Sequence, residues 1–197
     1  MSKGIFKKPI TAESLGLESK KLKQKLKTYL AGPIGDVPLK EARTWRDMVT
    51  ERLAQMGIGV LNPLHKESEM AVRRKLLLWS RTGNIDALRP LVNKELIDPD
   101  LEMVEASDFV TMWLPKEGQE VCGSYGEITH AYSHEVPVYV VTERKTRPLN
   151  IPYWAIGCST KIFRSWDDYF KYVEENWPVK NGEEKPKEEA KAQLQKK

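Results

Sequence analysis

The chain has 197 residues, of which 40% are hydrophobic and 30% are charged, and its formal net charge is +4. This length suits one folded domain with its own core. No apolar run approaches the ~20 residues that a membrane-spanning helix needs, and the basic N-terminus lacks a signal-peptide pattern, so we expect no membrane association. The two cysteines are too few for a disulfide framework, which predicts a cytoplasmic protein.

The positive charge is concentrated at the two ends of the chain. Residues 1–27 hold eight lysines and two glutamates, and residues 178–197 hold six lysines and four glutamates, so the ends carry +8 and the middle carries −4. Because nucleic-acid-binding domains normally present a basic folded surface, we expect no nucleic-acid polymer as a partner. We predict a basic N-terminal arm over 1–27, a folded domain over 28–177 and a disordered charged tail over 178–197.

The middle of the chain alternates short apolar runs, typical of strands, with segments of helical periodicity. In the first predicted helix, Trp45, Met48, Val49 and Leu53 share one side. The expected elements in the first half are a strand at Lys27–Ala31, a helix at Lys40–Met56, a strand at Ile58–Leu61 and a helical stretch at 64–97 that is broken at Thr82–Asn84. A further helix is expected to begin at Asp98, with Asp98 near its cap and Pro99 at its first position, and to end near Ser107. The remaining elements are a strand at Phe109–Leu114, a helix from Glu127 to about Glu135, strands at Pro137–Val141 and Ser159–Arg164, and a helix at Trp166–Asn176.

This alternation predicts a parallel sheet with helices on both faces, in which ligands bind at the carboxyl ends of the strands. Three polar segments are expected there: the turn beginning at Gly32, the region of Asp98 and Asp100, and the turn from Gly123 to Glu127. We place Glu127 on the first turn of a helix, where the helix dipole would keep its carboxylate ionised at neutral pH. Acidic residues are also common in first turns for capping alone, so both roles are open on local sequence.

Other kinds of site have weaker support. The turn Gly32–Gly35 lacks the dinucleotide-binding glycine spacing and the lysine of a phosphate-binding loop. His130 and His134 are four residues apart on one predicted helix, but no glutamate lies between them and no third ligand is evident. The sequence names no histidine that would activate Cys122, which is expected to be a small packing residue. We therefore expect no cofactor and no metal site.

Four segments, in order along the chain, resemble the nucleoside 2-deoxyribosyltransferases, and the resemblance covers residues 28 to about 170. They are the strand and turn Tyr29-Leu30-Ala31-Gly32-Pro33, the stretch Asp100 to Asp108 with its two aspartates eight residues apart, the segment Gly123-Ser124-x-x-Glu127-Ile128-x-x-Ala131, and the late loop Arg147 to Ile156. Each segment is a weak signal alone, whereas four in the family's order are more specific.

The resemblance implies a role for each of three catalytic residues. Glu127 would attack C1′ of a 2′-deoxynucleoside, Tyr29 would orient that carboxylate, and Asp100 would help proton transfer to the leaving base. The substrate-binding residues implied in the same way are Gly32, Pro33, Gly123, Ser124 and Asn150. The Asn150 amide would reach the sugar 5′-hydroxyl in a neighbouring subunit, which implies a homo-oligomer with shared active sites. Ser124 also fits a plain helix cap.

Independently of the resemblance, these residue types suit the cleavage of an N-glycosidic bond. Breaking an N-glycosidic bond builds positive charge at C1′, which a nearby carboxylate stabilises or captures. A covalent intermediate divides the reaction into two easier displacements. A carboxylic acid protonates the departing base, which leaves poorly as an anion.

We therefore predict a flavodoxin-like, Rossmann-like three-layer α/β fold with a parallel sheet of about five strands. The predicted function is 2-deoxyribosyl transfer between nucleobases in nucleotide salvage, with a small deoxynucleoside or deoxynucleotide and a free base as partners. Two alternatives stay open: a 2′-deoxynucleoside 5′-monophosphate N-glycosidase that uses water as the acceptor, and a non-catalytic nucleotide-binding module. The Asn150 amide favours the transferase because it suits an unphosphorylated hydroxyl. The presence together of Tyr29, Asp100 and Glu127 argues against the binding module.

Overall fold

The computed structural model describes residues 26–34, 37–65, 74, 76–116, 122–145 and 150–178. The elements are β1 (Lys27–Ala31), α1 (Leu39–Gln55), β2 (Gly59–Leu61), η2 (Pro63–His65), α3 (Ile85–Val92), the π-helix η3 (Asn93–Ile97), α4 (Asp98–Glu105), β3 (Phe109–Leu114), α5 (Cys122–Ser133), β4 (Val138–Thr142), α6 (Tyr153–Cys158), β5 (Lys161–Phe163) and α7 (Trp166–Asn176). Within these ranges, no helix combines the length and hydropathy needed to cross a bilayer. The predicted arm before Leu26 and the predicted tail after Pro178 lie outside the described residues.

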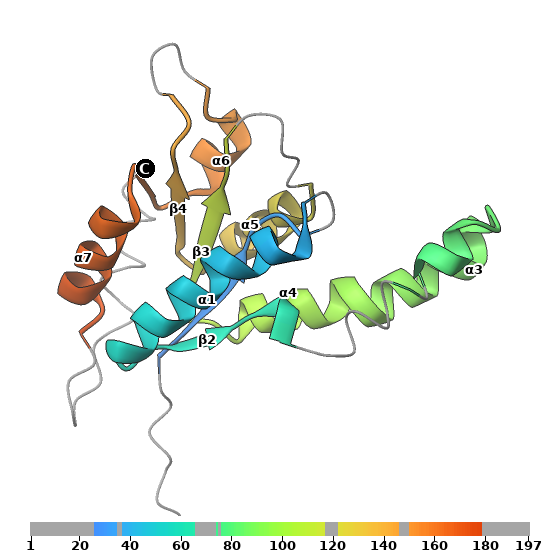
Figure 1. Ribbon diagram of the computed structural model, residues 1–197, viewed down its shortest axis with the longest axis horizontal. Coiled ribbons are helices and arrows are strands. Elements are labelled where there is room, and N and C mark those ends of the chain that lie inside the picture. The colour runs from blue at the N-terminus through green and yellow to red at the C-terminus, as the bar shows by residue number, and fades with distance from the viewer. Residues whose placement is uncertain are drawn as a thin grey trace, which may run out of the picture.

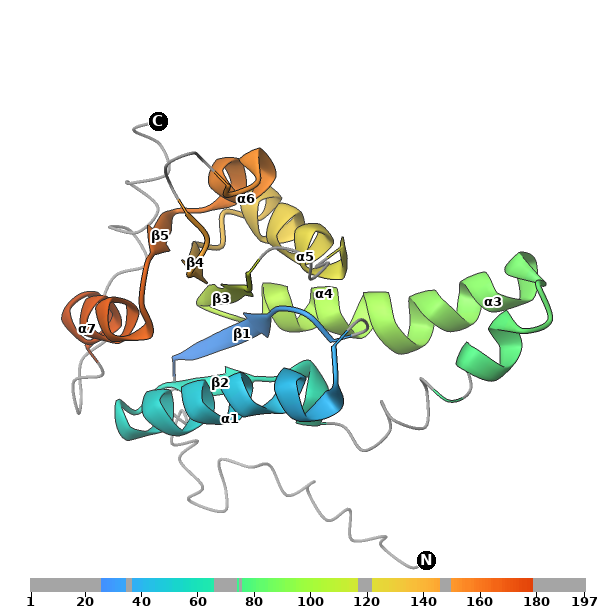
Figure 2. The same cartoon turned by 45° about the horizontal axis from the view of Figure 1, so that its top comes forward.

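The five strands form one parallel sheet in the order β2-β1-β3-β4-β5 (Figures 1 and 2). Its register places Thr28 of β1 between Val60 of β2 and Phe109 of β3. This strand order is that of doubly wound, flavodoxin-like sheets, so the predicted three-layer α/β fold is confirmed. In such sheets, ligands bind where the order reverses, which here is the carboxyl edge of β1 and β3.

Helices cover both faces of the sheet, and strand alternation divides the buried side chains between two cores. Leu30 joins the core beneath α1 and α7. Its neighbours Tyr29 and Ala31 point the other way and join the core beneath α4, α5 and α6. Figure 2 shows α1 on one side of the strands and α5 with α6 on the other. The phase of β1 therefore directs the Tyr29 side chain toward α4 and α5.

Asp108 fixes the start of β3 against the start of β1. Its Oδ2 accepts a hydrogen bond of 2.9 Å from the backbone N–H of Lys27. The backbone N–H of Asp108 in turn donates to the Lys27 carbonyl at 2.8 Å. These two bonds hold the two central strands in register at the edge opposite the expected ligand site.

The predicted apolar side of α1 is correct at three positions and wrong at a fourth. Trp45, Val49 and Leu53 are buried, whereas Met48 is 37% exposed. Arg46 occupies the buried stripe instead and is fully enclosed. The error has a physical reason: a buried arginine breaks the apolar pattern from which a helix face is predicted, although its spacing from Ala42 and Val49 fits that face.

The predicted break at Thr82–Asn84 is confirmed, and the predicted cap at Asp98 is wrong. Asn84 caps α3 by accepting a hydrogen bond of 3.0 Å from the N–H of Ala87. From there α3, η3 and α4 follow without interruption, and Ile97, before α4, already has helical angles. In an α-helix, the ring of Pro99 would crowd the carbonyl four residues earlier, and here that residue lies in the wider π turn. Both views show α3 extending away from the sheet (Figures 1 and 2).

Two further local predictions are wrong near the expected site. Helix α5 begins at Cys122, five residues before the predicted start, so Glu127 lies in its second turn. Glycines disfavour an isolated helix, but the burial of Ser124, Ile128 and Ala131 stabilises α5 against the sheet.

The short helix α6 was expected to be part of a loop. It follows Pro152 and buries Ala155 and Cys158, and six residues are too few to show a helical period.

Candidate active site

Tyr29 and Glu127 meet at the carboxyl side of β1. Tyr29 is fully buried, and its hydroxyl donates a hydrogen bond of 2.8 Å to Oε1 of Glu127. Strand alternation directs Tyr29 to this face, and α5 contacts both β1 and β3. Burial, followed by the charge of Glu127, raises the pKa of Tyr29 well above its ordinary value, so the tyrosine keeps its proton as the donor. This pairing is the one that the resemblance implies.

Glu127 as a whole is partly buried, and the second oxygen of its carboxyl, Oε2, is buried without a hydrogen-bond partner among the described residues. The pKa of this carboxyl is raised to about 7, first by burial and then by the nearby charge of Asp100. The Tyr29 hydroxyl, Arg46 and Ser124 act in the opposite direction. The prediction that Glu127 is fully ionised at neutral pH is therefore wrong, because desolvation outweighs the helix dipole in the second turn.

Asp100 belongs to the same group of side chains. It is the third residue of α4, which contacts both β1 and α5, and it is half-buried. Its charge raises the pKa of both Tyr29 and Glu127. The fold thus brings together the three residues predicted to be catalytic, from a strand and two helices. Two neighbouring carboxylates disfavour a state in which both are charged, which leaves a proton available to one of them.

Arg46 is a component of the site that the sequence analysis missed. Its guanidinium is fully buried and donates to the carbonyls of Gly32 at 2.9 Å, Pro33 at 3.2 Å and Ala42 at 2.9 Å. Its positive charge lowers the pKa of both Tyr29 and Glu127. Arg46 therefore holds the turn after β1 in place and partly offsets the desolvation of the carboxyl. The one signal in the sequence is its helical spacing from Ala42 and Val49.

Gly32 and Pro33, predicted to bind substrate, form the turn that Arg46 holds. A Cβ on Gly32 would lie 2.6 Å from Cζ2 of Trp45, so this position requires glycine for close packing. Both residues are buried. Their described interactions are structural, and contact with substrate stays a prediction.

The other residues predicted to bind substrate are Ser124 and Gly123, which precede Glu127 in α5, and Asn150, which lies in a later segment. Ser124 is 3% exposed and lies one helical turn before Glu127, which explains its effect on that pKa. Gly123 is exposed, and a Cβ there would meet no atom within 4 Å. Asn150 is half-buried, and its backbone N–H donates to Lys145 at 3.0 Å. In the described part of the chain no hydrogen bond joins Asn150 to Tyr29 or Glu127. Arg147, Pro148 and Leu149 of the late loop lie outside that part.

A cavity of about 250 Å³ lies on the other face of the sheet. Trp113 and Trp166, which belong to the core beneath α1 and α7, line it together with Arg164. Tyr29 belongs to the opposite core. The sheet therefore separates this cavity from the candidate catalytic residues.

No protein-family model matches the chain, and no curated protein matches it in sequence. Among solved structures, it is similar to a 2-deoxyribosyltransferase from Bacillus psychrosaccharolyticus, at 19% identity and a TM-score of 0.49, over 78% of this chain and 97% of that one. It is also similar to a CMP N-glycosidase from Clostridium botulinum, at 15% identity and a TM-score of 0.43, over 76% and 98% of the two chains. Likeness at this level concerns the path of the chain and assigns no role to a residue.

Proposed function

We propose that this protein is a nucleoside 2-deoxyribosyltransferase, which moves 2-deoxyribose from one nucleobase to another. The observation that carries the proposal is the pairing of Tyr29 with Glu127. The tyrosine hydroxyl holds one carboxylate oxygen at 2.8 Å, and the other oxygen has no hydrogen bond among the described residues. Such a carboxylate suits nucleophilic catalysis, because the held oxygen fixes its direction and the second oxygen remains able to react.

In the first step, Oε2 of Glu127 forms a bond to C1′ while the bond from C1′ to the base nitrogen breaks. The positive charge that develops on the sugar favours the ionised form of the carboxyl, which has a pKa of about 7 before substrate binds. In this state Asp100 holds the proton that the two neighbouring carboxyls share, and it gives that proton to the departing base. The products of this step are the free base and a 2-deoxyribosyl ester of Glu127.

In the second step, a nitrogen of an incoming base attacks C1′, and the bond to Glu127 breaks. The proton that this nitrogen loses returns to Asp100, which restores the starting state. Two displacements at one carbon give net retention of configuration. The hydrolytic alternative uses the same first step and differs only in having water as the acceptor.

The experiment supplies the protein with deoxyinosine and free adenine, and in parallel with deoxynucleoside 5′-monophosphates alone. The products are separated by chromatography, and the expected result is the formation of deoxyadenosine. Release of free base and deoxyribose 5-phosphate from the monophosphates, without transfer, would replace the proposal with the hydrolase. If neither product forms, the result would support the alternative of a non-catalytic nucleotide-binding module.

Two glutamate variants test the role of the nucleophile. Glu127→Gln keeps the size of the side chain and abolishes turnover, whereas Glu102→Gln, at an exposed position of α4, leaves it unchanged. Mass spectrometry of the wild-type protein with deoxyinosine and no acceptor base detects one added deoxyribosyl group, which Glu127→Gln lacks. Turnover by Glu127→Gln at the wild-type rate would refute this mechanism.

The proposal includes a homo-oligomer in which Asn150 serves a neighbouring subunit's site. A mixing experiment tests it: Glu127→Gln and Asn150→Ala are each impaired alone, and mixed oligomers regain sites with both native residues. Recovered activity after co-refolding supports sharing. No recovery, or a monomer in light scattering, contradicts sharing without affecting the role of Glu127.

A further inference from the structure

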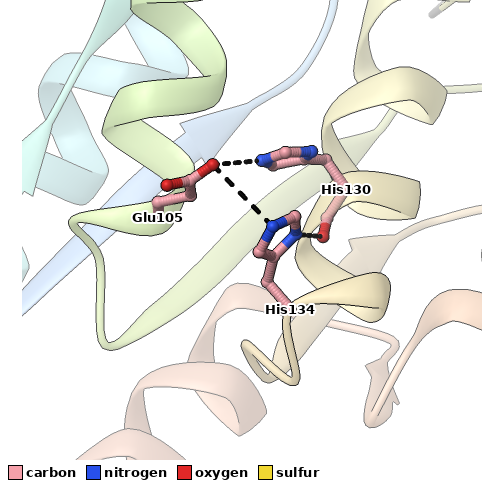
Figure 3. A group of neighbouring side chains, drawn as sticks. All are labelled: Glu105, His130 and His134. Atoms are coloured by element: carbon pink, nitrogen blue, oxygen red, sulfur yellow. Dashed lines mark hydrogen bonds and ion pairs between the residues drawn. The ribbon is translucent and has the colours of Figure 1, made fainter.

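Three possible metal ligands converge beyond the candidate active site, at the ends of α4 and α5. Figure 3 shows Glu105, the last residue of α4, facing His130 and His134 of α5. Oε1 of Glu105 lies 2.8 Å from Nε2 of His130 and 3.9 Å from Nε2 of His134. The sequence had indicated the histidine pair without a third ligand. The fold supplies one, because Glu105 is 25 residues from His130 in the chain and adjacent to it in space.

The spacing of these atoms is close to that of a tetrahedral zinc site. Two ligand atoms at about 2.1 Å from a tetrahedral Zn²⁺ lie about 3.4 Å apart. The observed separations of 2.8 and 3.9 Å fall on either side of that value. The ligand atoms of all three residues lie within 4.8 Å of one another. Changes in the side-chain torsion angles would bring the three ligand atoms to similar distances from one ion.

The hydrogen bonds of His134 prepare its ring to act as a ligand. Nδ1 lies 2.9 Å from the backbone carbonyl of His130, which can only accept, so Nδ1 carries the hydrogen (Figure 3). In the neutral ring, the lone pair is then on Nε2, which faces the Glu105 carboxylate. A lone pair facing a carboxylate oxygen favours a cation between them. A backbone carbonyl bound to the second ring nitrogen is a usual feature of metal-ligating histidines.

We propose that Glu105, His130 and His134 bind one Zn²⁺, with water completing the coordination. Two imidazoles and one carboxylate favour zinc over Mg²⁺ or Ca²⁺, which prefer oxygen ligands. The three side chains are 53%, 21% and 47% exposed, so an ion reaches them from solvent. The bound ion joins the end of α4 to α5, the two helices that carry Asp100 and Glu127. Zinc therefore stabilises the folded chain by holding these helices together.

The test uses the full chain without a histidine tag, freed of metal by a chelator and titrated with zinc chloride in a calorimeter. The expected result is saturable binding of one ion per chain and an increase in Tm that a chelator reverses. His134→Ala and Glu105→Gln each weaken zinc binding at least tenfold. Circular dichroism confirms that both variants are folded, since the substituted side chains are exposed or half-exposed.

Control variants exclude other ligands. His65→Ala removes the chain's remaining histidine, and Cys122→Ser removes its exposed thiol; neither changes the affinity. Absence of saturable binding overturns the proposal, as does wild-type affinity in His134→Ala. Wild-type affinity in Glu105→Gln also overturns it, because the histidine pair alone would then account for binding. None of these outcomes depends on deoxyribosyl transfer.

Discussion

Tyr29 and Glu127 are 98 residues apart in the chain and share one partly buried hydrogen bond of 2.8 Å. The strand phase of β1 and the packing of α5 on β1 create this contact. It leaves the two carboxylate oxygens in different environments, one hydrogen-bonded and one with no such bond in the described structure. The following predictions start from this asymmetry and from the groups around it.

Replacing Tyr29 with phenylalanine is expected to lower kcat about 10- to 100-fold with the fold retained. A hydrogen bond to a charged group contributes about 1.5–3 kcal/mol, which corresponds to this change in rate. The hydroxyl also lowers the pKa of Glu127, so its loss moves the acid limb of the kcat/KM profile upward from about pH 7. Steady-state kinetics between pH 5 and 9 measure both effects. An unchanged acid limb would show that Glu127 does not control it.

Glu127 is expected to make the folded chain less stable as the pH rises. Burial raises its folded-state pKa to about 7 from the ordinary 4.5, so between these values the folded state binds more protons than the unfolded state. The contribution is fully present below pH 4.5 and is lost as the pH rises through about 7, by up to about 3 kcal/mol. Urea denaturation at pH 5 and pH 8 measures the loss. Glu127→Gln, which does not titrate, has a smaller difference between the two; an equal difference would refute the raised pKa.

Arg46→Leu is expected to destabilise the fold by about 3 kcal/mol or more. It removes the donors to the carbonyls of Gly32 and Pro33 at the end of β1. It also removes a positive charge that lowers the pKa of Glu127, so residual activity requires a higher pH. Arg43→Leu, at an exposed position of α1, is the matched control and changes stability by less than about 0.5 kcal/mol. Denaturant titration of both variants tests this, and equal effects would contradict the structural role of Arg46.

Gly32→Ala and Gly157→Ala are expected to change stability in opposite directions. The new Cβ at Gly32 would lie 2.6 Å from the ring of Trp45, which costs about 1–3 kcal/mol. The new Cβ at Gly157, in α6, meets no atom within 4 Å, and alanine favours a helix over glycine by about 0.5–1 kcal/mol. Thermal unfolding distinguishes the two variants. A Tm for Gly32→Ala at or above the wild-type value would mean that the turn moves away from α1 without cost.

Features that repeat along the chain could be predicted, and features that depend on partners distant in sequence could not. The bounds of β1, β3 and α7 follow from local patterns and agree with the structure. Helix α5 was placed too late, because its glycines lower local helix propensity while its buried residues gain their stability only from the sheet. The run from α3 through η3 into α4 was divided at Asp98, because a proline after an acidic residue is usually a helix start.

The sequence by itself determined the alternation of strands and helices, because the strand and helix periods depend on neighbouring residues. The choice of Tyr29, Asp100 and Glu127 as candidates came from the family resemblance of the segments that contain them. Tertiary structure alone decided the chemistry available to them. The pKa of Glu127 near 7 results from burial and from Asp100, Arg46 and Tyr29, which lie on three other elements. Glu105 likewise joins His130 and His134 only when α4 packs on α5. Desolvation and charge act through space, so these properties exist only once the chain is folded.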